Sequence, residues 1–113
     1  MPISNEAKHG TVDLAILAIL ERQDRYGLEI LDEVKRLSGG GLTFKVGSLY
    51  PALHRMVRRG LLTARWELSD TGGAPRKYYR ITQEGLQQLQ HKREEWRRVR
   101  DSMEPFLTSA ALP

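Results

Sequence analysis

Residues 46–62, VGSLYPALHRMVRRGLL, decide the fold of this chain. Their apolar positions recur every three or four residues, the spacing of one face of an α-helix; they are Val46, Leu49, Leu53, Met56 and Val57. The opposite side collects small and basic residues, namely Gly47, Ser48, Pro51, Arg55 and Arg58, flanked by His54 and Arg59. The pattern predicts a helix with one face in the core and one basic face left free.

The proline within this stretch indicates where the helix begins. Proline in a helix interior removes a hydrogen bond and clashes with the preceding turn, at a cost of about 3 kcal/mol, whereas in the first turn it does no harm. We therefore expect the helix to begin near Gly47 or Ser48, to run to Arg59 and to end at Gly60.

Two further helices are predicted before this stretch. Residues 11–22 (TVDLAILAILER) are apolar nearly all round, which is typical of a buried helix, with Thr11 as its cap. Residues 26–37 (YGLEILDEVKRL) carry one apolar stripe, formed by Ile30, Leu31, Val34 and Leu37. The sequence SGGG at residues 38–41 predicts a flexible break after the second helix.

A β-hairpin and a long helix are predicted after it. Residues 61–68 (LLTARWEL) alternate between apolar and polar side chains, as in a half-buried strand, and residues 76–82 (RKYYRIT) form its partner. The sequence SDTGGAP between them has turn chemistry. A helix start signal at Thr82 opens a long polar helix, which we expect to end just before Pro105.

This order of elements predicts the fold class. The chain is expected to be mainly α with a small β-hairpin: a winged helix-turn-helix followed by a long C-terminal dimerisation helix. Four parts are expected along the chain: an N-terminal arm at 1–10, a winged helix-turn-helix DNA-binding domain at 11–82, the dimerisation helix at 83–107 and a tail at 108–113.

Composition narrows the class of function. The 113 residues are expected to form one domain. They contain no cysteine, and the longest apolar run is too short to cross a bilayer, so we expect a cytoplasmic protein without a targeting segment. The three histidines, His9, His54 and His91, lie far apart without ligand partners, and no nucleophile–base pair has a recognisable spacing. We expect no metal, no cofactor and no enzymatic activity.

The formal charge of +4 is concentrated in the middle of the chain. Residues 45–80 hold eight basic residues against two acidic ones, a net +6; the basic ones are Lys45, Arg55, Arg58, Arg59, Arg65, Arg76, Lys77 and Arg80. A concentrated excess favours a polyanion partner. The small-residue start of the helix allows a close approach to a phosphate, and arginines further along it suit guanine acceptors or phosphates. The plain alternative is that these arginines only solvate an exposed helix.

The long helix carries a seam of residues at steps of three and four: Leu89, Lys92, Trp96, Val99, Met103 and Phe106. A domain of this size has nothing left to cover such a seam, so we expect a homodimer. A two-fold dimer would present two recognition helices to a palindromic site in double-stranded DNA, with half-sites about 10 base pairs apart or a multiple of that. Trp96 is either plain dimer core or the wall of a cavity for a flat aromatic compound.

Three motifs together resemble the PadR family of bacterial transcriptional regulators. They are YGLEI at residues 26–30, GSLYPALHRM at 47–56 and RKYYRIT at 76–82, followed by EG. The resemblance covers about residues 10–107, and the single C-terminal helix is similar to the smaller subfamily. One difference is Val57, where family members commonly carry an acidic residue.

The resemblance implies a dimeric winged-helix repressor, whose long helix pairs with the first helix of its partner, where Leu14 and Leu17 lie. It implies DNA contacts at Ser48 and Tyr50 in the third helix, at Tyr26 where the second helix opens, and at Arg76 and Lys77 in the wing. Some short members bind planar drug-like molecules at the dimer centre through a tryptophan, at the place of Trp96. A module for an acidic protein partner, or a small-molecule sensor without specific DNA binding, remains as an alternative.

Overall fold

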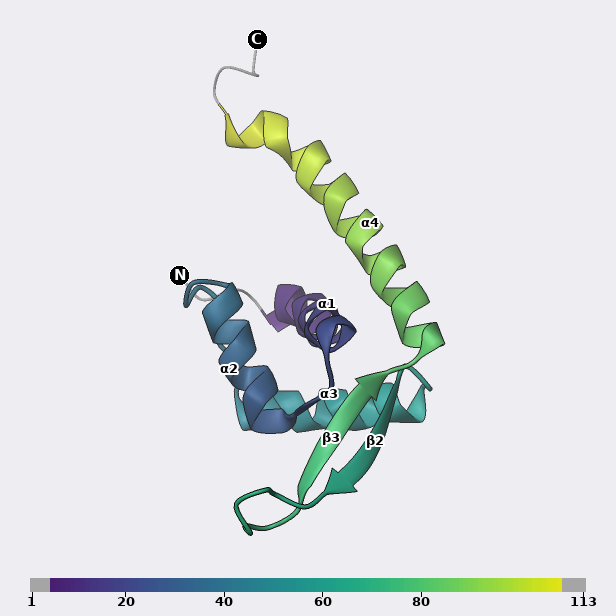
Figure 1. Cartoon of the computed structure of the whole chain (residues 1–113). Helices are drawn as coiled ribbons and strands as arrows, with labels where there is room; N and C mark the ends of the chain where they lie inside the picture. The colour runs from purple at the N-terminus through teal and green to yellow at the C-terminus, as the bar shows by residue number, and fades with distance from the viewer. Residues whose placement is uncertain (1–4, 109–113) are drawn as a thin grey trace.

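The computed structural model describes residues 5–108, which form four helices and a small sheet (Figure 1). Along the chain the elements are α1 (Asn5–Arg22), β1 (Arg25–Tyr26), α2 (Gly27–Leu37), α3 (Val46–Arg58), β2 (Leu62–Glu67), β3 (Arg76–Ile81) and α4 (Gln83–Leu107). The predicted fold class is confirmed: three helices precede a hairpin, and a long helix follows it. Residues 1–4 of the predicted arm and 109–113 of the predicted tail lie outside the described residues.

The sheet contains the predicted hairpin and one strand that was not predicted. Strands β2 and β3 pair antiparallel from Leu62 opposite Ile81 to Glu67 opposite Arg76. The two-residue strand β1 adds to the other edge of β3, where Arg25 lies opposite Tyr79. Strand β1 thereby ties the start of α2 to the base of the hairpin, which is the wing of the fold.

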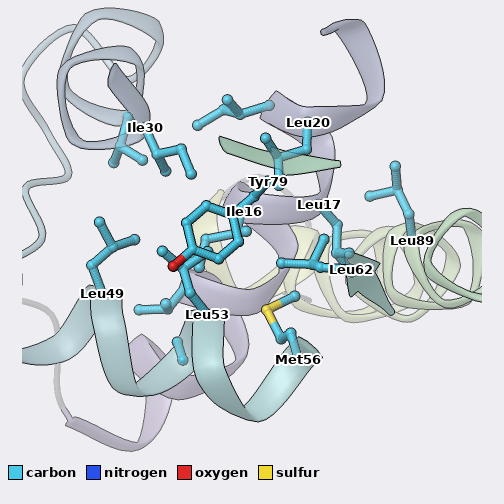
Figure 2. Close-up of a cluster of buried hydrophobic side chains, with 14 residues drawn as sticks. Ile16, Leu17, Leu20, Ile30, Leu49, Leu53, Met56, Leu62, Tyr79 and Leu89 are labelled. Atoms are coloured by element: carbon cyan, nitrogen blue, oxygen red, sulfur yellow. The ribbon is translucent and has the colours of Figure 1, made fainter. Parts of the chain in front are cut away.

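One apolar core joins the four helices and the hairpin (Figure 2). Its fully buried side chains are Ile16, Leu17, Leu20, Ile30, Leu49, Leu53, Met56, Leu62, Tyr79 and Leu89. The ring of Tyr79, from the wing, lies among the helical side chains, and Leu89 brings the first turns of α4 into the same cluster. Because burial of each such side chain contributes about 1.5–3 kcal/mol, this cluster fixes the helices, the base of the wing and the start of α4 relative to one another.

The predicted helix signals act through specific hydrogen bonds. Helix α3 has Arg58 as its last residue and is terminated by Gly60, whose φ of +76° is left-handed. There the Leu61 N–H donates to the Met56 carbonyl and the Gly60 N–H to the Val57 carbonyl, which is the Schellman arrangement. Thr82 caps α4 by accepting from the Gly85 N–H at 3.0 Å. Both signals are local, which explains why the sequence predicts them.

Three predicted helix ends were wrong. Helix α1 begins at Asn5, so Thr11 lies inside it and is not its cap. Helix α3 begins at Val46, which places Pro51 in the second turn. Pro51 has no N–H to donate to the Gly47 carbonyl, and because Gly47 is exposed, that carbonyl can bond to water instead. Helix α4 continues through Pro105 to Leu107, because the carbonyl that Pro105 leaves unpaired belongs to exposed Asp101.

Several apolar residues assigned to inner faces are exposed. Val46 at the start of α3 and Leu37 at the end of α2 are each about half exposed, and Trp66 and Leu68 are exposed on the wing. In each case the residue lies at the end of its element, beyond the reach of the core. Only the first half of β2 is therefore the half-buried strand that its alternation predicts.

The chain is elongated, because α4 projects away from the three-helix body (Figure 1). Its extents are 63 × 29 × 22 Å and its radius of gyration is 16.4 Å, against roughly 13 Å for a compact domain of this length. Within the described part of the chain no helix is long and apolar enough to span a membrane.

Candidate nucleic-acid interface

Helix α3 divides its residues between core and solvent as its sequence predicts. Leu49, Ala52, Leu53 and Met56 are buried. The predicted contact residues of the free face are exposed, namely Lys45, Ser48, Pro51, His54, Arg58 and Arg59. Among the described residues no side chain caps the helix start at Lys45, so the first backbone N–H groups of α3 have no side-chain partner at the positive end of the helix dipole.

Arg55 does not belong to this free face, contrary to its predicted role. Its guanidinium forms an ion pair with the Asp13 carboxylate of α1, and both side chains are largely covered. The pairing partner is 42 residues away in the sequence, which is why helical periodicity could not reveal it. Arg55 therefore fastens α3 to α1.

Tyr50 of α3 lies where α3 meets the start of α2 and strand β3 of the wing. It is half-buried, and its ring packs against Gly27 so closely that any side chain at Gly27 would overlap the phenol group. A larger residue at Gly27 would therefore force the Tyr50 ring to move, and with glycine there Tyr50 is held between α3 and the start of α2. Burial raises the pKa of the neighbouring Tyr79, with Tyr50 adding to the shift, so the Tyr79 phenol remains protonated.

The wing presents stacked rings and cations. The Arg76 guanidinium lies 4.6 Å from the ring centroid of Tyr26, and Lys77 Nζ lies 5.7 Å from that of Trp66. Tyr26 in turn meets Tyr78 edge to face, with centroids 5.5 Å apart. Such contacts hold both cations in place without neutralising them. Tyr26, Arg76 and Lys77, predicted from separate motifs, are therefore brought together.

The other two wing arginines are neutralised at its base. The Asp24 carboxylate accepts hydrogen bonds from Arg65 of β2 at 2.6 Å and from Arg80 of β3 at 3.1 Å. Partial burial raises the pKa of Asp24, but the hydrogen bonds from Arg80 and Arg65 outweigh it and leave the pKa below its ordinary value. Asp24, which lies just after α1, thus locks both strands of the wing to the helical body.

We expect Asp24→Asn to destabilise the protein by about 1 kcal/mol at pH 7, because it removes the charge of two salt bridges and keeps the shape. A carboxylate with a depressed folded-state pKa stabilises the fold above its unfolded pKa of about 3.9 and loses this effect as the pH falls through the folded value. Urea denaturation should therefore show a gap in stability at pH 7 that narrows as the pH falls below the unfolded pKa of about 3.9. The exposed Asp70→Asn variant is the matched control, and an equal loss in both variants would contradict the lock.

The part of the chain that contains α3 is free of acidic residues. Between Glu33 and Glu67 the chain has no aspartate or glutamate, and this span contains the whole of α3. Glu67 itself is engaged by Arg65 at 2.8 Å. After the ion pairs of Arg55, Arg65 and Arg80 are formed, α3 and the wing still keep unpaired cations among the described residues, so their surface remains positive.

The predicted dimer residues separate into two groups. Leu17 and Leu89 are 0% exposed and lie in the chain's own core, so neither has surface left for a partner. The other predicted dimer residues on the same two helices remain accessible to solvent. Leu14 is half-buried, and the exposed ones are Trp96, Val99, Met103 and Phe106. An apolar groove of about 590 Å³ lies between α1 and the outer half of α4, lined among others by Leu14, Trp96, Val99 and Met103.

Sequence reasoning missed three residues that shape the interface. The sequence patterns give Asp24 no role, count Arg65 only in the general charge excess, and place Trp66 on the apolar face of an alternating strand. Their roles depend on contacts across more than 40 residues or, for Trp66, on the strand leaving the core. An isolated acid between two helices, followed by a hairpin with arginine in both strands, is the signal that would have suggested the lock.

Comparisons with known proteins support this geometry. Residues 16–91 match the family described as the transcriptional regulator PadR-like family. A transcriptional regulator structure from Clostridium thermocellum has a TM-score of 0.84 at 31% identity, covering 95% of this chain and 100% of that one. A PadR family regulator from Clostridium difficile has a TM-score of 0.72 at 36% identity, covering 86% and 98%.

A curated relative agrees with these structures. The transcriptional regulator YqjI of Escherichia coli is 33% identical over 104 residues, which is 92% of this chain and 48% of the relative, so the chain spans about half of that protein. Three helices with a basic third helix and a wing define a winged helix-turn-helix protein of the DNA-binding class. This chain belongs to the PadR-like family of transcriptional regulators, which are DNA-binding regulators and not enzymes.

Proposed function

We propose that this regulator is a dimeric cytoplasmic repressor that binds a palindromic operator through α3 and the wing. The observation that carries the proposal is the free positive charge on two elements. Among the described residues, exposed Arg58 and Arg59 of α3 and Arg76 and Lys77 of the wing form no ion pair, whereas Arg55, Arg65 and Arg80 are paired. A surface of this kind suits the phosphate backbone, which supplies most of the affinity for DNA.

The elements of the interface have different tasks in this proposal. Helix α3 enters the major groove with its uncapped N-terminus first, so that Ser48, Pro51 and His54 approach the bases while Lys45, Arg58 and Arg59 meet phosphates. Arg76 and Lys77 lie along the backbone or the adjacent minor groove and position the protein. Tyr26 and Tyr50 contact DNA at the inner edge of the interface, where their rings also support Arg76 and the start of α2.

The dimer is proposed from the uncovered half of α4. Trp96, Val99, Met103, Phe106 and Leu107 are between 44% and 71% exposed on a helix that projects beyond the body. In a dimer these side chains would pack against α4 of the second copy and against its α1, where Leu14 lies. This packing would remove a continuous apolar strip from water. The two-fold axis would then set the spacing of two recognition helices.

We expect Val99→Asp to shift the protein from dimer to monomer in sedimentation experiments, since two-fold pairing brings both new carboxylates into an apolar strip. Val99 is exposed in the single chain, so circular dichroism should remain unchanged. Because a monomer contacts one half-site only, operator affinity should fall more than tenfold. Leu37→Asp, at an equally exposed apolar residue of α2, is the control. Dimers of the Val99→Asp variant would contradict this interface.

A planar aromatic effector at Trp96 is the finer part of the proposal. The apolar groove beside Trp96 has the volume of a drug-sized ligand site. A ligand bound there between two copies would favour the dimer geometry that fits the ligand. If this geometry separated the two recognition helices by a distance different from that of the operator half-sites, DNA would be released.

A further inference from the structure

A second cleft, which shares no lining residue with the groove at Trp96, opens between α3, the start of α2 and the wing. Its volume is about 420 Å³, within the usual range of small-molecule sites. Four aromatic side chains line it, from four different elements: Tyr26, Tyr50, Trp66 and Tyr79. Arg76 and Lys77 complete the wall on the side of the wing.

The charge of this cleft is entirely positive. None of its ten described lining residues is acidic. Across the residues that the structure describes, Arg76 and Lys77 form no ion pair, whereas the neighbouring Arg65 and Arg80 are both taken by Asp24. The nearby Glu29 carboxylate accepts from the Tyr26 backbone N–H at 3.2 Å, and Glu67 is paired with Arg65. The two free cations therefore have capacity for an external anion.

The rings define what kind of anion fits. Trp66 is 68% exposed, so one large π surface is open, and Tyr26 and Tyr50 are half-buried at the inner end. Arg76 and Lys77 already lie over the Tyr26 and Trp66 rings at 4.6 and 5.7 Å. A flat ring would stack in this cleft while its acidic substituent met the cations, so that one ligand would satisfy both kinds of wall.

We propose that the cleft binds a small planar aromatic anion, a carboxylate or sulfonate on one or two fused rings. Such a ligand would occupy the angle between α3 and the wing and would exclude DNA directly. That competition rests on the proposed function, whereas binding of the anion does not. This site differs from the groove at Trp96, which is apolar and would act through dimer geometry.

A nucleotide of bound DNA carries the same two features, a flat ring and an anion. The two sources are distinguished by comparing free ligands. If the cleft is a ligand site, naphthalene-2-carboxylate should bind more tightly than thymidine monophosphate, because its charge and ring are joined without a sugar. If the cleft serves only as a nucleotide subsite of the DNA interface, the order should be reversed, and the proposal would be overturned.

The test uses the two tryptophans of the chain as reporters. Their indole N–H signals in a proton–nitrogen NMR spectrum are assigned with Trp66→Phe and Trp96→Phe, and naphthalene-2-carboxylate is titrated into the whole protein without DNA. We expect a saturable shift of the Trp66 signal. The neutral 2-naphthylmethanol should bind at least about tenfold more weakly, as should the cationic 2-naphthylmethylammonium, because a charge-assisted contact is lost. Equal binding of all three compounds, or a shift of Trp96 alone, would overturn the proposal.

A matched pair of variants locates the anion contact. Lys77→Gln should weaken binding of naphthalene-2-carboxylate at least fivefold, whereas Lys35→Gln, at an exposed lysine on α2, should leave it unchanged. Equal affinity in both variants would contradict the cleft as the site. Displacement of labelled operator DNA by the same compound is measured separately, so that a protein that binds the anion without binding DNA would refute the proposed function and leave the cleft intact.

Discussion

The double variant Arg58→Ala/Lys77→Ala is expected to lose at least about 100-fold in DNA affinity, because it removes one cation from α3 and one from the wing. Each contact is worth roughly a factor of ten, and the two lie on separate elements, so the losses should add. The slope of log affinity against log salt should become shallower by about 0.9 for each phosphate contact that is lost. Fluorescence anisotropy with a labelled duplex over a salt series measures both effects.

The control for this variant carries the same loss of charge elsewhere. Lys35→Ala/Arg98→Ala removes one exposed cation from α2 and one from α4. If net charge alone governed binding, the two double variants would weaken it equally. That equality would contradict an interface made of α3 and the wing, whereas a loss confined to Arg58 and Lys77 would support it.

Gly85→Ala is expected to lower the free energy of unfolding by about 3 kcal/mol relative to an unhindered glycine-to-alanine change. Gly85 is buried in the first turn of α4, and an added methyl group would overlap the Leu61 carbonyl oxygen and lie 2.6 Å from Ile81 Cγ1. Because the carbonyl is backbone and also accepts from the Thr82 N–H, α4 itself would have to move.

Gly10→Ala supplies the unhindered case. Gly10 lies in α1, and an added methyl group there would have no atom within 4 Å. Alanine should stabilise the helix by up to about 1 kcal/mol. Urea denaturation of the two variants compares the same chemical change in two helices. A similar stability for both would mean that α4 is not docked on Leu61 as the fold requires.

The parts of the fold that the sequence predicts are those governed by local chemistry. Gly60 ends α3 through a left-handed turn, and Thr82 caps α4 through its own hydroxyl group. The apolar faces of α2 and α3 follow from helical period alone. Each of these signals acts within about four residues, so no knowledge of distant contacts is needed.

The parts that escaped prediction depend on distant partners. Strand β1 has only two residues and exists because Arg25 and Tyr26 pair with β3, more than 50 residues later. Arg55 lies at a position that periodicity assigns to solvent, yet Asp13 of α1 draws it inward. Leu89 has the seam spacing of a dimer contact, and the family resemblance implies such a contact for Leu17, but the chain's own tertiary packing buries both side chains.

The candidate interface likewise has a part that follows from local sequence and a part that depends on distant contacts. Exposed basic and small residues on α3 are readable from sequence, since their side of the helix is set by Leu49, Leu53 and Met56. Which cations remain free is a tertiary property. Asp24 neutralises Arg65 and Arg80 and leaves Arg76 and Lys77 available, so the charge of the wing is selected by one carboxylate from outside it.

The most direct test of the account is binding of the wild-type protein to the DNA upstream of its own gene. Fluorescence anisotropy is measured over a salt series, with a scrambled duplex of the same composition as competitor. We predict a clear preference for the upstream DNA, with an affinity that falls steeply as salt rises. Equal affinity for both duplexes at every salt concentration would contradict a sequence-specific repressor.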